Sequence, residues 1–142
     1  MSKKNYETRL VTIDSIDSVW FGVEYLISKT SDEIMDENDI YRYLISGEYR
    51  LFIVVEKDSK EFITAYVTCM AYYPRHKACR IISLAGSNLF EWYKDSIAFV
   101  ENYAKREECD YMEVFGRRGW IKIMKDYKEE CVILRKNLIN KG

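Results

Sequence analysis

The first part of the chain changes from strand-like to helix-like spacing of its apolar residues. Residues 6–13 alternate between apolar and polar side chains well enough to predict a first strand. Asp14 or Ser15 can cap a helix that follows. Apolar residues then recur three and four positions apart, which predicts a helix that buries one face, made of Ile16, Val19, Trp20, Val23, Leu26 and Ile27.

An acidic stretch from Ser31 to Asp39 interrupts this spacing, and we interpret it as a loop. Its charge is typical of solvated surface, and an acidic loop also suits a basic partner. A short helix is predicted from Ile40 to Ser46, because Gly47 is the residue that helices favour directly after their last turn.

Three strand-like segments with short polar turns come next. They cover residues 49–56, 62–72 and 77–84. Pro74 belongs in the second turn, because proline has no N–H to give to a sheet ladder. We therefore expect an antiparallel meander of three strands.

After the meander the chain has the order strand, helix, strand. The helix is predicted from Leu89 to about residue 105, where Asn88 and Glu91 can form a capping box. The next strand is Tyr111–Phe115. A helix between two strands predicts that they run parallel, here 77–84 with 111–115.

Two more elements are predicted at the C-terminal end. Trp120, Ile123, Met124 and Tyr127 have the spacing of a second amphipathic helix, and residues 131–138 form a last strand. Trp120 is interpreted as a core anchor, with a stacking platform as the alternative. The predicted fold class is α/β with a mixed sheet (α+β in its connections), in one domain over residues 1–142.

Composition excludes some classes of partner. Among 142 residues the net charge is −1, which creates no field that attracts nucleic acid. No apolar run reaches the ~18 residues that span a bilayer, and residues 1–5 do not resemble a secretion signal. We expect a protein that is not secreted and has no transmembrane segment, located in a cytoplasm or packaged in a larger particle.

Cysteine and histidine are too sparse and too scattered for a zinc site. Cys69, Cys79, Cys109 and Cys131 form no Cys-x-x-Cys pair, and His76 is the single histidine. Cys69 and Cys79 can face each other across the hairpin, but we expect all four thiols to be reduced and buried. His76 is interpreted as an exposed turn residue. No metal is expected.

The element order resembles that of the GNAT N-acetyltransferase superfamily. From Tyr73 onward the chain is similar to a group of small phage-encoded GNAT-like proteins, which includes relatives of an internal virion protein of short-tailed phages. The residues that carry this resemblance are Tyr73-Pro74-Arg75, Leu84-Ala85-Gly86, the helix near Trp92, Cys109-Asp110 and Gly116-Arg117-Arg118-Gly119-Trp120.

The resemblance implies an acetyl-CoA site after the fourth strand. Active members carry Gln/Arg-x-x-Gly-x-Gly/Ala there, and backbone N–H groups hold the pyrophosphate. The equivalent residues here are Leu84, Gly86, Ser87 and Asn88, with one glycine and no preceding Arg or Gln. Asn88 as a helix cap is the alternative to a phosphate contact.

The resemblance also implies a tyrosine that protonates the departing thiolate. Met124 occupies that position, and Tyr127 lies one turn away. Tyr127 is therefore the candidate acid only if the protein is active.

Three charged residues near the predicted strand ends are further candidates. Arg117 and Arg118 could grip a phosphate, or form a salt bridge or a solvated turn. Glu113 is a weak candidate base, as is Glu56, but for both we expect an exposed strand face instead.

These observations predict a phage-type accessory or virion-associated protein with a degenerate acetyl-CoA site, acting through contacts with a virion or host protein. The cofactor is then none. The alternatives are an active N-acetyltransferase that uses acetyl-CoA, and an inhibitor or regulator of a host protein.

Overall fold

The computed structural model describes residues 5–86, 89–116, 120 and 122–139. A single five-stranded sheet forms its centre, in the order β1-β2-β3-β4-β5. The elements are β1 (Tyr6–Val11), α1 (Ile16–Ser28), α2 (Glu37–Ser46), β2 (Tyr49–Glu56), β3 (Phe62–Tyr72), β4 (Lys77–Gly86), α3 (Leu89–Arg106) and β5 (Tyr111–Val114), with a short 3-10 turn at Ile13–Ser15 before α1.

The sheet is antiparallel except for its last pair. β1, β2, β3 and β4 follow one another as antiparallel neighbours. β5 runs parallel to β4, with Ala78 opposite Tyr111 and Ile81 opposite Val114. The predicted meander and the predicted parallel pair are both confirmed.

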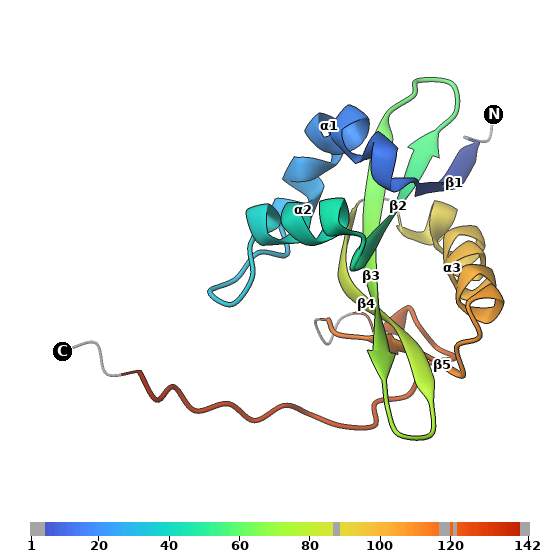
Figure 1. Ribbon diagram of the computed structural model, residues 1–142. Coiled ribbons are helices and arrows are strands. Elements are labelled where there is room, and N and C mark those ends of the chain that lie inside the picture. The colour runs from blue at the N-terminus through green and yellow to red at the C-terminus, as the bar shows by residue number, and fades with distance from the viewer. Residues whose placement is uncertain (1–4, 87–88, 117–119, 121, 140–142) are drawn as a thin grey trace.

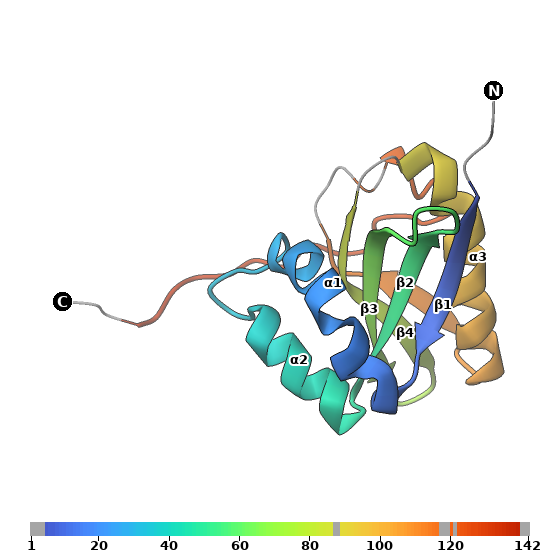
Figure 2. The same ribbon diagram turned by 90° about the horizontal axis from the view of Figure 1, so that it is seen from above.

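Helices cover both faces of the sheet, as the two views show (Figures 1 and 2). α1 and α2 lie on one face and α3 on the other. Each face has its own apolar cluster, so the inner strand β2 is buried on both sides from Leu51 to Val55. This explains why β2 has a continuous apolar run and does not alternate.

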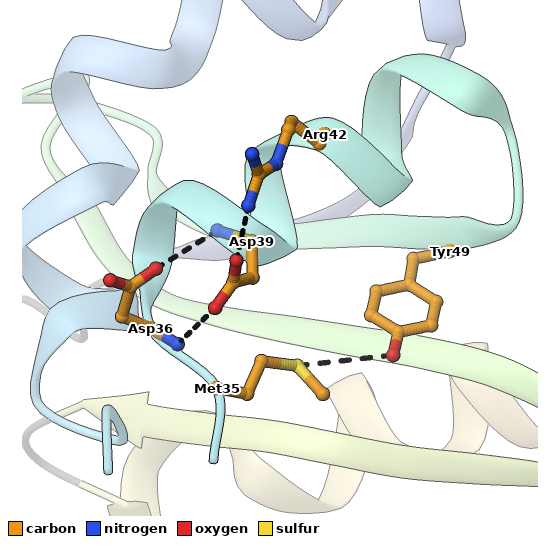
Figure 3. A network of polar contacts seen from close by, with 5 residues as sticks. All are labelled: Met35, Asp36, Asp39, Arg42 and Tyr49. Atoms are coloured by element: carbon orange, nitrogen blue, oxygen red, sulfur yellow. Dashed lines mark hydrogen bonds and ion pairs between the residues drawn. The ribbon is translucent and has the colours of Figure 1, made fainter. Parts of the chain in front are cut away.

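α2 begins three residues earlier than the spacing of apolar residues predicts. The Asp36 carboxylate accepts a 3.0 Å hydrogen bond from the Asp39 N–H, and the Asp39 carboxylate accepts one of 3.0 Å from the Asp36 N–H (Figure 3). This reciprocal capping box extends the helix into the stretch interpreted as a loop. Gly47 ends the helix with φ +86°, as expected.

The predicted helix at residues 120–127 is reduced to a short turn. Its described backbone bonds run from the N–H groups of Ile123 and Met124 to the Trp120 carbonyl, and from Tyr127 to Met124. Trp120, Met124 and Tyr127 still pack on the α3 side of the sheet. Apolar spacing thus identified the packing side chains, but so short a segment does not sustain a helix.

The last predicted strand is also not formed. Residues 128–139 have no assigned strand, and each of them is exposed. In both views this segment leads away from the body of the molecule (Figures 1 and 2). Apolar residues alone do not make a strand, because a strand needs a neighbour for its backbone groups.

Candidate functional site

The sheet opens between β4 and β5 halfway along β4. Among the described residues the parallel pairing ends at Ile81 and Val114, followed by a 2.9 Å bond from the Phe115 N–H to the Ile81 carbonyl. β4 continues to Gly86 with β3 as its partner. Among the residues that the structure describes, the far half of β4 therefore pairs with β3 alone.

A bulge marks the point where the two strands part. Val67 of β3 lies opposite Ser83 and Thr68 lies opposite Ile81, so Ile82 is an extra residue in β4. A bulge bends its strand and increases the local twist. The bend separates β4 from β5 at the carboxyl ends of the parallel pair, where ligands bind in open α/β sheets. α3 begins at Leu89, just beyond this opening.

Leu84 and Gly86 lie on the open half of β4, but packing within the chain accounts for both. Leu84 is buried in the cluster beneath α3. A Cβ on Gly86 would overlap Thr64 Oγ1 and lie 2.9 Å from the Ile63 carbonyl. The neighbouring strand thus already requires a glycine here. Ser87 and Asn88, and with Asn88 the predicted capping box, lie outside the described residues.

The second glycine-containing segment is described in part. Arg117, Arg118 and Gly119 lie outside the described residues. Gly116 lies against the indole of Trp120, whose Cδ1 would be 3.1 Å from an added Cβ. Trp120 is half-buried and packs at the edge of the α3 cluster. It is a contact at the edge of the core and not its anchor.

Tyr127 and Met124 lie on the α3 side of the sheet. Met124 is buried, and the Tyr127 hydroxyl donates a 2.7 Å hydrogen bond to Glu101 Oε2 on α3. Burial, and then the bond to Glu101, raise the pKa of the Tyr127 phenol far above its ordinary value. A phenol in this setting holds its proton tightly, so Tyr127 is poorly suited to protonate a thiolate.

Glu113 is engaged in a cluster on the opposite face of the sheet. Its carboxylate accepts a 3.0 Å bond from Arg80 Nε and a 2.6 Å bond from the Tyr73 hydroxyl. The Arg80 guanidinium also donates to the Tyr73 oxygen at 3.1 Å and lies 4.2 Å from the ring centre of Phe115. Both carboxylate oxygens of Glu113 are therefore occupied, Oε1 by Arg80 and Oε2 by the Tyr73 hydroxyl. Glu113 is half-buried by these contacts, so it lies neither free as a base nor on the exposed strand face that we expected.

Glu56 has a structural place as well, but it is not on the exposed strand face that we expected. It is buried at the end of β2 and accepts bonds from the N–H groups of Ser59 and Asp58, at 2.7 and 3.3 Å. Its carboxylate closes the turn into β3. The expectation of exposure was wrong because a turn, and not solvent, satisfies the carboxylate.

The sulfur and histidine residues form no metal centre. Among the described residues no group of three or more His, Cys, Asp or Glu side chains is arranged to hold a metal ion. All four cysteines are free thiols, with Cys79 buried and Cys131 exposed. The expectation that all would be buried therefore holds only for Cys79, because Cys69 and Cys109 are half-buried and Cys131 is exposed. His76 lies in the β3–β4 turn, 3.2 Å from the Asp110 carboxylate.

Two features of this region could not be predicted from the sequence. The bulge at Ile82 has no signature in the run Ile81-Ile82-Ser83, because its cause is the register with β3. Arg80 was not singled out, since a basic residue inside an apolar strand reveals no partner until β5 brings Glu113 beside it.

Sequence comparison gives no relative: no protein-family model and no curated protein matches this chain. Comparison with solved structures is more informative. An aminoglycoside acetyltransferase from an uncultured soil metagenomic sample superposes with a TM-score of 0.68 at 11% identity, over 94% of this chain and 97% of that one. Glucosamine-6-phosphate N-acetyltransferase from Arabidopsis thaliana gives a TM-score of 0.67 at 10% identity, over 96% and 100%.

A GNAT family acetyltransferase from Staphylococcus aureus superposes over 94% of this chain and 98% of that one, with a TM-score of 0.65 and 17% identity. The chain has the GNAT fold. Such low identities establish the fold alone, and the GNAT fold agrees with the mixed sheet, its parallel β4–β5 pair and α3 across one face. In the described part of this GNAT-fold chain, no helix has the length and apolar character needed to cross a bilayer.

Proposed function

We propose that this protein is an N-acetyltransferase that binds acetyl-CoA in the opening between β4 and β5. The observation that carries the proposal is the end of the parallel pairing at Ile81 and Val114, while β4 continues to Gly86. The similarity of the fold to acetyltransferases that act on amino groups of sugars and aminoglycosides supports the same class of reaction.

The open half of β4 fits the shape and chemistry of this cofactor. Between Ile82 and Gly86 the strand offers N–H and C=O groups on the edge that faces away from β3. An extended chain with amide groups can pair with such an edge as an added strand would. The pantetheine arm of acetyl-CoA is a chain of this kind. The nearby start of α3 offers the partial positive charge that suits a diphosphate.

Acetyl-CoA, when bound, supplies the acetyl group as an activated thioester. Both described candidates for an acid or a base are already engaged: Tyr127 is bonded to Glu101, and Glu113 to Arg80. We therefore assign to the protein the task of holding amine and thioester together, which alone can lower a barrier by roughly 7–11 kcal/mol. Solvent then receives the amine proton and protonates the thiolate.

A second candidate function follows from the positions of Tyr127 and Met124. Loss of a general acid typically costs about 10²–10⁴-fold in rate, and Met124 cannot donate a proton. Loss of the acid favours a protein with a degenerate acetyl-CoA site. Such a protein would act through contacts with a virion or host protein, either as an accessory protein or as an inhibitor.

Calorimetry with acetyl-CoA and a thiol-release assay with amino sugars, aminoglycosides and peptides separate the two candidates. We expect binding, and acetyl transfer to at least one class of amine. At a hundred times its dissociation constant, a ligand adds about 2.7 kcal/mol of stability, which a thermal melt detects. Absence of binding would favour the second candidate.

Hydrogen exchange locates the ligand with a control inside the same strand. Acetyl-CoA should slow exchange at those amides of residues 82–86 that β3 does not bond, and leave residues 77–81 unchanged, because β3 and β5 already flank them. Binding without protection of residues 82–86 would show that the site lies elsewhere.

A further inference from the structure

A pocket of about 520 Å³ lies at the other end of β4 from the opening between β4 and β5. It is formed where the first residues of β2 and β4, the last residues of β3 and the end of α3 come together. Its lining includes Arg50, Thr68, Met70, Tyr72, Lys77 and Tyr103. A concave site of this size is typical of pockets that hold small organic ligands.

Alternation along the strands places the polar side chains of this pocket on the α3 face of the sheet. Arg50 comes two residues before Phe52, which belongs to the cluster beneath α3. Thr68 comes two residues after Tyr66, which belongs to the same cluster. Because residues two apart on a strand share a face, Arg50 and Thr68 lie beneath the end of α3, where Tyr103 is buried.

Two cations at this pocket have no acidic partner. Among the described residues, no ion pair includes Arg50 or Lys77, and both are half-buried. Burial raises the pKa of the Tyr103 phenol, and the nearby Arg50 guanidinium counteracts this rise. The Lys77 ammonium donates a 2.7 Å bond to the Glu107 carbonyl and lies 5.8 Å from the ring centre of Tyr72. Partly desolvated cations without a counterion are unfavourable, so the pair favours an anion.

The floor of the pocket contains a hydroxyl without a good partner. Thr68 is 1% exposed, and its Oγ1 has no hydrogen-bond partner among the described residues. The Cys79 thiol lies beside it, but a thiol is at most a weak donor and acceptor. Because buried hydroxyls are nearly always bonded, Thr68 indicates that a polar group is missing from this place.

The remaining walls favour an organic acid over a bare ion. Met70 and the rings of Tyr72 and Tyr103 provide apolar surface beside the two cations. Glu48 and Glu107, both exposed, also line the pocket and oppose a second negative charge on the ligand. The pocket therefore suits one negative charge on an apolar body.

We propose that this pocket binds a small carboxylate with an apolar body, held by the Arg50 guanidinium and the Lys77 ammonium. The planar fork of arginine matches the two oxygens of a carboxylate. Met70 and Tyr72 then contact the apolar body of the ligand. This inference does not depend on the proposed acetyltransferase activity, since it uses neither the opening at β4 nor acetyl-CoA.

NMR titration of the full chain with acetate, hexanoate, benzoate and phenylacetate tests the proposal. We expect phenylacetate to bind with a dissociation constant in the millimolar range or below, and to shift the amide signals of residues 47–50, 68–72 and 103–107. Phenylacetamide, its neutral counterpart of the same shape, should bind about tenfold to a hundredfold more weakly, the effect of a lost charge-assisted hydrogen bond. Inorganic phosphate should also bind more weakly than phenylacetate.

Three results would overturn the proposal. They are equal binding of phenylacetate and phenylacetamide, tighter binding of phosphate than of any carboxylate, and no binding of all four acids in the millimolar range. Shifts confined to residues 82–86 would place the acid in the opening at β4 and would overturn it as well.

Arg50→Gln removes the cation but keeps a side chain that can bond to Tyr103. Phenylacetate affinity should fall about tenfold to a hundredfold. Without ligand, the variant should melt no lower than the unchanged protein, because a half-buried cation without a counterion has been removed. Arg75→Gln is the matched control, since Arg75 is exposed in the β3–β4 turn, and it should keep the affinity. Equal affinities of the two variants would contradict the role of Arg50.

Thr68→Val keeps the shape of the side chain and removes the hydroxyl. Phenylacetate affinity should fall about twofold to tenfold, the effect of one neutral hydrogen bond. Without ligand, the melting temperature should not fall, because the hydroxyl has no good partner to lose. An unchanged affinity would show that Thr68 does not face the ligand.

Discussion

At the scale of single residues, Tyr127 shows how a hydrogen-bond partner changes the role of a side chain. Its phenol is the one candidate acid in the last segment, yet it donates to Glu101 at 2.7 Å and packs beside α3. Burial and the neighbouring carboxylate both oppose its ionisation. The residue thus joins the C-terminal segment to α3, through a hydrogen bond that uses its proton.

Tyr127→Phe keeps the ring and removes only the hydroxyl. We expect a loss of about 0.5–1.5 kcal/mol in the free energy of unfolding, the usual net value of one hydrogen bond. If the protein transfers acetyl groups, kcat should change little. Urea unfolding and the thiol-release assay measure the two effects. A fall in kcat of about a hundredfold or more would instead identify Tyr127 as the general acid.

Gly86 illustrates a glycine that packing within the sheet requires. Gly86→Ala would place a methyl group against Thr64 and the Ile63 carbonyl, and a β-branched side chain next to backbone cannot easily move away. We expect a loss of about 1–3 kcal/mol, as for other overpacked sites. A thermal melt that leaves Gly86→Ala unchanged, together with weaker acetyl-CoA binding, would show that the glycine serves the ligand.

At the scale of elements, the start of α2 depends on carboxylates and not on apolar spacing. The capping box of Asp36 and Asp39 satisfies two N–H groups that the first turn leaves unbonded, and Arg42 bonds to Asp39 one turn later (Figure 3). Met35, directly before the cap, accepts a bond from the Tyr49 hydroxyl at 3.8 Å. These contacts fix where the loop ends and the helix begins.

Asp36→Ala removes the cap and should cost about 0.5–2 kcal/mol of stability. Urea unfolding monitored by circular dichroism measures this loss. Asp14→Ala is a suitable control, because Asp14 is an exposed carboxylate before α1 where no side-chain cap is formed. Equal effects of the two changes would mean that the capping box adds nothing beyond its charge.

The same carboxylates predict a dependence of stability on pH. The Asp36 N–H and then Arg42 lower the pKa of Asp39, backbone N–H groups lower that of Asp32, and the Ser31 hydroxyl lowers that of Glu37. A lowered pKa in the folded state means that stability is fully present above the pKa of the unfolded chain, near 4. It is lost as pH falls through the folded values. The urea concentration at the midpoint of unfolding should therefore decrease as the pH is lowered through this range. The decrease should be less steep for Asp39→Asn than for the unchanged protein.

At the scale of the whole molecule, stability rests on two clusters on opposite faces of the sheet. The larger side chains of the α3 face centre on Trp92, which is 1% exposed and meets Tyr66 edge-on at 6.3 Å between ring centres. The Tyr66 hydroxyl is bonded to Ser96 at 2.6 Å, so the buried polar atom is satisfied. Trp92, and not Trp120, is the tryptophan at the centre of the core.

Trp92→Ala should therefore cost about 3–5 kcal/mol, a large part of the stability of an ordinary domain. Trp120→Ala should cost clearly less, because its indole is only half-buried. Thermal melts of the two variants side by side test the ranking. A reversed order would show that the segment around Trp120 carries more of the fold than its burial indicates.

Much of the framework could be predicted from the sequence because it depends on local patterns. The strands β2 and β3 and the helix α3 occupy the predicted residues, or differ at one end by a residue. These patterns are local: apolar residues recur every two residues in strands and every three or four in helices, a turn contains Pro74, and a helix ends at Gly47. The parallel β4–β5 pair follows from the helix between them.

Tertiary structure alone decided the features on which the proposed function depends. The bulge at Ile82 arises from the register of β4 on β3, and the engagement of Tyr127 by Glu101 joins residues far apart in the chain. Residues 131–138 have the composition of a strand, but no strand is assigned to them in the described part of the chain. Strand pairing, ion pairs and burial depend on contacts between residues that are distant in the sequence. The local pattern of apolar and polar residues does not identify these contacts.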